Sequence, residues 1–199
     1  MTWDFSTLVP LIAMISYAVL FIVVVRQRPQ LQVHRAFATY LFTMGIWSLG
    51  SFLSHAGIGD ASFSFRLLTA GSFASSNAFF HFVQVFLHRQ ARWAKAIYLF
   101  SAMLLVLILI TNLAILSASV EGGVLSYEFG ILAFIIGPIG YGLYVFSLIA
   151  LSREARRAKT QHQKNRTKYL LLGVLLILAV SATNFTPLGR YPIDVGVNV

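Results

Sequence analysis

Cysteine is absent from this 199-residue chain, and charged residues make up only 11% of it. Without cysteine, neither a disulfide nor thiol chemistry is available to the protein. Soluble domains usually carry about 25% charged residues. Here 58% of the residues are hydrophobic and the mean hydropathy is +0.78. The composition therefore predicts an integral membrane protein whose first partner is the lipid bilayer.

Long polar segments are also lacking, because the apolar residues gather into six stretches with short segments between them. These stretches cover residues 8–25, 36–53, 67–87, 96–116, 131–151 and 169–185. A helix needs about 20 apolar residues to cross a bilayer. We therefore predict an all-α fold in which residues 1–199 form a single membrane-embedded domain. It is a polytopic transmembrane helix bundle of six complete spans, with the start of a seventh at residues 195–199.

Asp, Glu, Lys and Arg are missing from the interior of all six stretches. Ion-coupled transporters usually place such groups at mid-membrane, so this lack argues against proton-coupled transport. The sequence also shows no Ser-His-Asp set, HExxH motif, phosphate-binding loop or paired intramembrane carboxylates. We predict that these residues carry no catalytic group and do not form an enzyme.

Basic residues are confined to alternate loops. Apart from Arg66 and Arg190, every Lys and Arg lies at or between the ends of stretches one and two, three and four, or five and six. Apart from Glu154, every acidic residue lies on the opposite side. Short loops rich in Lys and Arg stay in the cytoplasm, so the N-terminus is predicted to lie outside. The net charge of +9 then reflects topology and does not indicate a nucleic-acid partner.

The third stretch is the most polar of the six. Its Asn77, His81, Gln84 and His88 recur at i, i+4, i+7 and i+11 and therefore share one face of a helix. Hydrogen bonding between helices is one interpretation of Asn77, His81 and Gln84. The other is a ligand-binding cavity that opens to the outside and takes an unidentified small or apolar molecule, or a polar switch. Weaker ligand-binding candidates for the same cavity are Tyr40, Trp47 and Asn184.

Small residues accompany this polar face. Gly71 and Ser75 form a small-xxx-small pair, which lets helix backbones approach closely. We therefore predict that the third helix is central and tightly packed. The fourth stretch is the most uniformly aliphatic, so we predict that it faces lipid.

The fifth stretch contains Pro138 and Gly140, which favour a kink or close approach. The kink is either static or a hinge that passes an outer event to the basic segment 152–168. That segment has no Gly or Pro and is predicted to extend the fifth and sixth helices. Residues 117–130 are predicted to form an outer loop.

Histidines are too scattered for a metal or haem site. His81 is the one histidine predicted to lie deep, whereas His55 is near the outer surface and His34 and His88 are near the inner one. A bis-histidine haem needs two at matching depth, and a zinc site would need cysteine or carboxylate ligands. We predict no metal and no cofactor.

Three segments carry a family resemblance. They are HRAFATYLFTMGIWSLGSF at 34–52, FFHFVQVFLHR at 79–89 and KNRTKYLLLGVLLILAVSATNFTPLGRYPIDVGVNV at 164–199. Together they resemble the N-terminal seven-transmembrane sensor region of bacterial histidine kinases. The resemblance covers nearly the whole chain, but the seventh span and the C-terminal output domain are absent from it.

The resemblance implies a function. The chain would be the sensory input module of a bacterial two-component receptor, multi-pass in the inner (plasma) membrane. It would relay an extracellular or membrane signal to a covalently following cytoplasmic output domain, and by family analogy it would work as a homodimer. The alternative is a small-molecule transporter or channel subunit, which flux in liposomes would reveal.

Overall fold

Six helices and one β-hairpin make up the fold. The computed structural model describes residues 5–27, 31–89, 94–121 and 124–182. The helices and strands, in chain order, are α1 (Phe5–Gln27), α2 (Gln32–Ala56), α3 (Ala61–Phe86), α4 (Ala94–Ile110), β1 (Ile115–Glu121), β2 (Val124–Phe129), α5 (Ala133–Arg157) and α6 (Gln161–Ala182). Each of the six predicted apolar stretches overlaps a different helix, which confirms the helical architecture.

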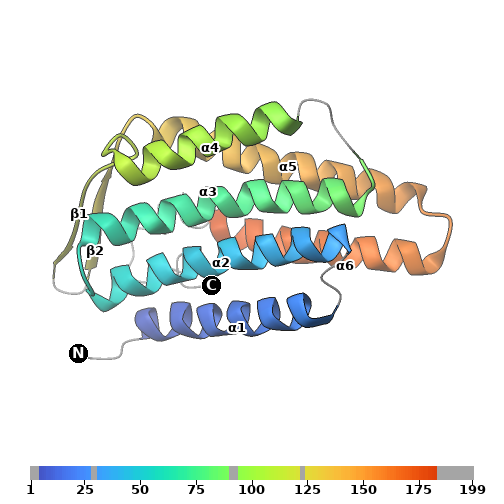
Figure 1. Ribbon diagram of the computed structural model, residues 1–199, viewed down its shortest axis with the longest axis horizontal. Helices are drawn as coiled ribbons and strands as arrows, with labels where there is room; N and C mark the ends of the chain where they lie inside the picture. Colours follow the sequence, from blue (N-terminus) through green and yellow to red (C-terminus); the bar gives the residue numbers. More distant parts are fainter. Residues whose placement is uncertain (1–4, 28–30, 90–93, 122–123, 183–199) are drawn as a thin grey trace.

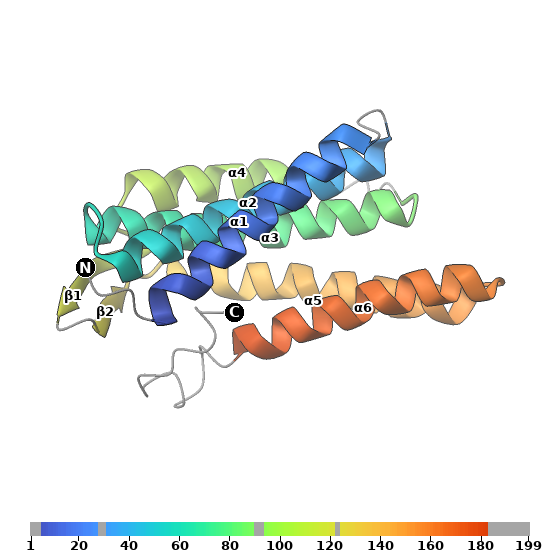
Figure 2. The same cartoon turned by 90° about the horizontal axis from the view of Figure 1, so that it is seen from below.

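Helix α3 occupies the centre of the bundle (Figure 1). It packs against α2, α4, α5 and strand β1, whereas α1 lies against α2 and α6 lies against α5. Figure 2 shows α1 crossing α2, with the α5–α6 pair on the other side of α3. The buried residues of α3 run from Ser64 to Gln84 along the helix. The prediction of a central, tightly packed third helix is confirmed.

The β-hairpin is the main departure from the sequence prediction. Strands β1 and β2 pair antiparallel in the region predicted to be an outer loop, and they lie across one end of the bundle. The Tyr127 ring stacks on Phe65 of α3 with a centroid separation of 4.5 Å. The prediction that the fourth span continues to residue 116 is wrong, because α4 ends at Ile110 and Leu116 lies in β1.

The connections alternate between the two ends of the bundle. The α2–α3 turn and the two strands lie at one end, and the end of α3, the start of α4 and the α5–α6 connection lie at the other (Figure 1). The α5–α6 turn is short because α5 runs to Arg157 and α6 begins at Gln161. This confirms the predicted helical extension of both spans. The basic residues are therefore concentrated at the end opposite the hairpin.

Apolar surface covers much of the bundle. Among the described residues, α1, α2 and α5 are long and apolar enough to cross a membrane, and α4 is a shorter apolar helix. On α4, Leu99 and Ile110 are 74% and 73% exposed, whereas Leu104 and Ile108 face the core. Such a surface is suited to lipid, and the lipid-facing position of the fourth helix stays a prediction. Helix α3 is less apolar than α1, and five of its polar residues, Ser64, Ser75, Ser76, Asn77 and Gln84, are buried.

Candidate functional site around helix α3

The α2–α3 interface depends on two glycines. A Cβ placed on Gly71 would lie 2.6 Å from the Trp47 backbone nitrogen, and one on Gly50 would lie 2.4 Å from that of Leu68. No side chain fits at either distance, so the two backbones are in direct contact. Close backbone approach is how membrane helices gain dispersion energy without a hydrophobic driving force. From this contact we infer that α2 and α3 behave as one rigid pair.

A polar contact joins α3 to α5 inside the core. The hydroxyls of Ser75 and Tyr144 are 3.2 Å apart, and the Ser75 hydroxyl also donates to the Ser72 carbonyl at 2.8 Å. A serine hydroxyl has one proton, so Tyr144 is the donor in the contact between the two. The Phe79 ring stacks on Tyr144 at 5.5 Å between centroids. In the same region, Gly140 allows α5 to approach Ser76.

Helix α2 adds Tyr40 to the same cluster. Its ring is 5.4 Å from that of Phe79, and the residue is only 7% exposed. The Tyr40 hydroxyl lies near those of Tyr17 and Tyr144 but makes no hydrogen bond of normal geometry. A buried hydroxyl without a partner is costly. Tyr40, Ser75, Phe79 and Tyr144, the aromatic junction, thus bring together α2, α3 and α5 around an incompletely satisfied polar centre.

The opposite side of α3 faces α4. His81 Nδ1 lies 2.9 Å from the Tyr98 hydroxyl, and the two rings meet edge to face. Asn77 is buried and donates through Nδ2 to the Phe73 carbonyl, while its Oδ1 has no hydrogen-bond partner. Gln84 is buried one turn beyond His81. One of the predicted polar residues thus bonds between helices, and another bonds within its own helix.

A second unsatisfied group lies on α4. The Ser101 hydroxyl is buried and, like Asn77 Oδ1, has no partner. Helices α3 and α4 run antiparallel, and His81 and Tyr98 lie at the same height. Ser101 is one turn after Tyr98 and Asn77 is one turn before His81, so Ser101 and Asn77 also lie at about the same height. The α3–α4 seam therefore carries polar atoms with unused hydrogen-bonding capacity at mid-helix depth.

The predicted site residues do not form one group. His81 contacts α4, and Asn77 and Gln84 are buried on the same face of α3 by their helical spacing. Tyr40 instead belongs to α2 and lies in the aromatic junction. Trp47 also lies on the α2 side, where its backbone meets Gly71. The predicted site residue Asn184 lies outside the described residues.

The predicted hinge lies within a continuous α5, where Pro138 is exposed and Gly140 is buried against α3. Gly140 therefore has a packing role, and its action as a hinge stays a prediction.

Sequence reasoning misses the hydroxyl pair of the aromatic junction. In the sequence, Ser75 stands out only as a small residue, and Tyr144 only as part of the glycine-rich fifth stretch. Buried hydroxyls in two apolar helices are a signal that could have found them, because such groups usually seek a partner in another helix.

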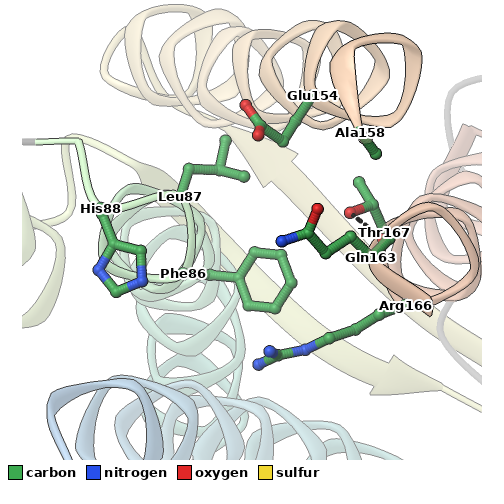
Figure 3. A pocket seen from close by; sticks show the side chains of 8 residues that line it. All are labelled: Phe86, Leu87, His88, Glu154, Ala158, Gln163, Arg166 and Thr167. Atoms are coloured by element: carbon green, nitrogen blue, oxygen red, sulfur yellow. Dashed lines mark hydrogen bonds between the residues drawn. The ribbon is translucent and has the colours of Figure 1, made fainter. Parts of the chain in front are cut away.

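A pocket lies at the basic end of the bundle. It has a volume of about 180 Å³ and lies between the end of α3, the end of α5 and the start of α6 (Figure 3). Arg89 pairs with Glu154 at 3.5 Å, which joins α3 to α5. The Arg166 guanidinium lies 4.4 Å from the centre of the Phe86 ring, which joins α6 to α3. This end therefore couples all three helices by charged contacts.

No metal site is evident in the ranges that the structure describes, because no three His, Cys, Asp or Glu side chains gather there.

The comparison with known families decides the class. The family model of the N-terminal 7TM region of histidine kinase matches residues 9–197, nearly the whole chain. The chain belongs to this family. No curated protein and no solved structure matches it. The chain is therefore a membrane-embedded sensor region of the histidine-kinase type and takes part in signal transduction.

Membership in this family gives the core contacts a context. Buried polar groups without a hydrogen-bond partner are costly, so their positions in the core are of interest for a sensor region. The aromatic junction and the α3–α4 seam are the two places in the described chain where these groups lie on or against the middle of α3.

Proposed function

We propose that this chain is the input module of a receptor in the bacterial inner membrane. In this proposal the bundle crosses the membrane with six helices, and the N-terminus and the β-hairpin lie outside. It relays an extracellular or membrane signal to an output domain that follows in the parent protein. The concentration of basic residues at the end opposite the hairpin supports this orientation.

The observation that carries the proposal is the aromatic junction. The Ser75–Tyr144 hydrogen bond joins the rigid α2–α3 pair to α5, and α5 continues as one helix to the basic end. A shift of α3 against α5 would exchange this bond for another, since Tyr40 offers a nearby unpaired hydroxyl. Two alternative bonding arrangements of similar energy are what a switch requires.

The stimulus in this proposal acts on the α3–α4 seam. A small molecule with a donor and an acceptor would satisfy Asn77 Oδ1 and the Ser101 hydroxyl, and His81 and Gln84 lie on the same face. A change in the bilayer would act through the exposed side of α4. Either stimulus shifts the balance only by its differential affinity for the two packings. Moving a population from 1:99 to 99:1 takes about 5.5 kcal/mol of such difference.

The test is a signalling assay on a receptor in which this chain is followed by a histidine-kinase catalytic region. Autophosphorylation is measured in membranes for Tyr144→Phe, which removes the cross-helix hydroxyl and keeps the ring. Tyr169→Phe is the matched control, because Tyr169 is 73% exposed on α6. We expect Tyr144→Phe to shift the basal activity and Tyr169→Phe to leave it unchanged.

The ligand site is tested separately in the same receptor. Asn77→Ala, His81→Ala and Gln84→Ala are compared one at a time at matched expression. Loss of the stimulus response in at least one of them is expected. Normal signalling in all three variants would refute the proposed ligand site between α3 and α4. Normal signalling in Tyr144→Phe as well would refute the proposed coupling of α3 to α5 through the aromatic junction.

A further inference from the structure

The pocket at the basic end has the chemistry of an anion site. Its lining includes His88 from the end of α3, Glu154 from α5, and Gln163 and Arg166 from α6. Figure 3 shows the Gln163 amide and the Arg166 guanidinium projecting from α6 toward the space beside Phe86. With about 180 Å³ the pocket has room for several water-sized groups.

Arg166 is held in place without being neutralised. Its guanidinium lies over the Phe86 ring at 4.4 Å, a cation–π contact that orients the group. Within the described ranges, no carboxylate lies within ion-pair distance of Arg166. A planar guanidinium with its donor edges available favours phosphate and carboxylate ligands.

The acid in the pocket is compensated. The Glu154 carboxylate faces the same space, but its Oε2 is 3.5 Å from the Arg89 guanidinium. The remaining charge of the lining is therefore positive. Of the charged side chains that line the pocket, Arg166 is the one without an ion-pair partner. A singly charged phosphodiester balances that one cation, whereas the second charge of a phosphomonoester would lie beside Glu154 with no further cation of the lining to pair with.

A specific turn at the end of α3 positions His88 and Arg89. His88 adopts a left-handed conformation with φ of 53°. The Arg89 backbone N–H donates to the Gln84 carbonyl at 2.8 Å, and the His88 N–H donates to the Val85 carbonyl at 3.1 Å. This is a Schellman motif, in which glycine is the usual residue at the left-handed position. The turn places His88 at the edge of the pocket and carries Arg89 to Glu154.

We propose that this pocket binds the phosphodiester of a phospholipid headgroup, with Arg166 and the Gln163 amide as donors. The location at the basic end, where the membrane helices α3 and α5 stop, favours a lipid of the inner leaflet as its source. This position rests on the orientation given in the proposed function. Because the site joins the ends of α3, α5 and α6, a bound headgroup would stabilise their present packing.

The experiment measures lipid binding to the purified 199-residue chain by native mass spectrometry in detergent. Phosphatidylglycerol is the probe, and diacylglycerol with the same acyl chains is the phosphate-free control. Because Arg166 is exposed, we expect Arg166→Gln to weaken phosphatidylglycerol binding by roughly two- to fivefold, the loss typical of one solvent-screened ionic contact. Phe86→Leu keeps the Arg166 charge but removes the aromatic ring that orients the guanidinium. We therefore expect a smaller loss of phosphatidylglycerol binding than in Arg166→Gln.

Arg156→Gln is the matched control, because Arg156 is exposed and lies on the face of α5 opposite Glu154 and Ala158. Equal losses in Arg156→Gln and Arg166→Gln would show that only net charge matters and would overturn the proposal. Unchanged binding in Arg166→Gln, or equal binding of diacylglycerol, would also overturn it.

A competition experiment with a soluble compound distinguishes a membrane lipid from a soluble phosphodiester as the ligand. The headgroup glycerophosphoglycerol, without acyl chains, is added as a competitor. If it displaces the lipid at comparable concentration, the site is supported and its ligand is assigned to the soluble phase. If it does not, the lipid is assigned. The readout is lipid binding and not kinase output, so a failure of this inference is distinguishable from a failure of the signalling proposal.

Discussion

The glycine contact between α2 and α3 gives the most quantitative prediction. In Gly71→Ala the new Cβ would lie 2.6 Å from the Trp47 nitrogen and 2.7 Å from its Cα. Carbon atoms pack at about 3.5–4.0 Å, so the two helices must separate by about 1 Å. Overpacking of this kind costs about 1–3 kcal/mol. Against this cost, alanine gains about 1 kcal/mol over glycine in a helix.

Gly45→Ala measures the gain in helix propensity of alanine over glycine without any overpacking. Gly45 lies on α2, and no atom lies within 4 Å of the place that an alanine methyl group would take there, so the same substitution meets open space. We therefore expect Gly71→Ala to be less stable than Gly45→Ala by roughly 1–3 kcal/mol, which is the overpacking cost alone. For a chain of this size that difference corresponds to about 2–12 °C in Tm.

The assay is thermal unfolding in detergent, followed by circular dichroism. Gly50→Ala should behave like Gly71→Ala, because its Cβ would lie 2.4 Å from the Leu68 nitrogen. Equal melting temperatures for Gly71→Ala and Gly45→Ala would refute the direct backbone contact, and with it the rigid α2–α3 pair.

Three further substitutions test other contacts. Tyr144→Phe removes one buried hydrogen bond to Ser75 and should lower the unfolding free energy by about 0.5–1.5 kcal/mol in the same melting assay. Tyr127→Ala removes the ring that stacks on α3 and should raise amide hydrogen exchange in the hairpin while leaving α2 unchanged. Arg89→Gln breaks an ion pair whose side chains are 37% and 41% exposed, so it should cost no more than about 1 kcal/mol. That cost should fall further at high salt.

The central role of α3 is predictable from the sequence for a physical reason. A helix whose polar residues share one face and whose small residues share another must be surrounded by protein in a membrane. The same pattern does not identify the neighbouring helix. His81 meets Tyr98 of α4, and Ser75 meets Tyr144 of α5, and both pairings depend on bundle topology that periodicity alone does not contain.

The hairpin escapes prediction because its apolar start continues the apolar run of α4. Thr111 ends that helix locally, since its hydroxyl donates to the Leu107 carbonyl and accepts from the Leu113 N–H. Such local bonds compete with helix propagation. A Gly-Gly pair at 122–123, between segments of high β-propensity, is a hairpin signal. The sequence thus contains a signal for the hairpin. The apolar Ile115 and Leu116 nevertheless extend the predicted fourth span into the first strand.

The interfaces around α3 differ in a way that bears on where motion would occur. The α2–α3 contact is backbone against backbone at Gly50 and Gly71, and any sliding there meets immediate overlap. The α3–α5 contact has one hydroxyl pair in its core, with an unpaired Tyr40 hydroxyl beside it. Exchange of one buried hydrogen bond for another costs far less than overlap. If the module signals as proposed, α5 and α6 therefore move as a unit against α2 and α3, and the Arg89–Glu154 pair lies where that movement reaches the basic end.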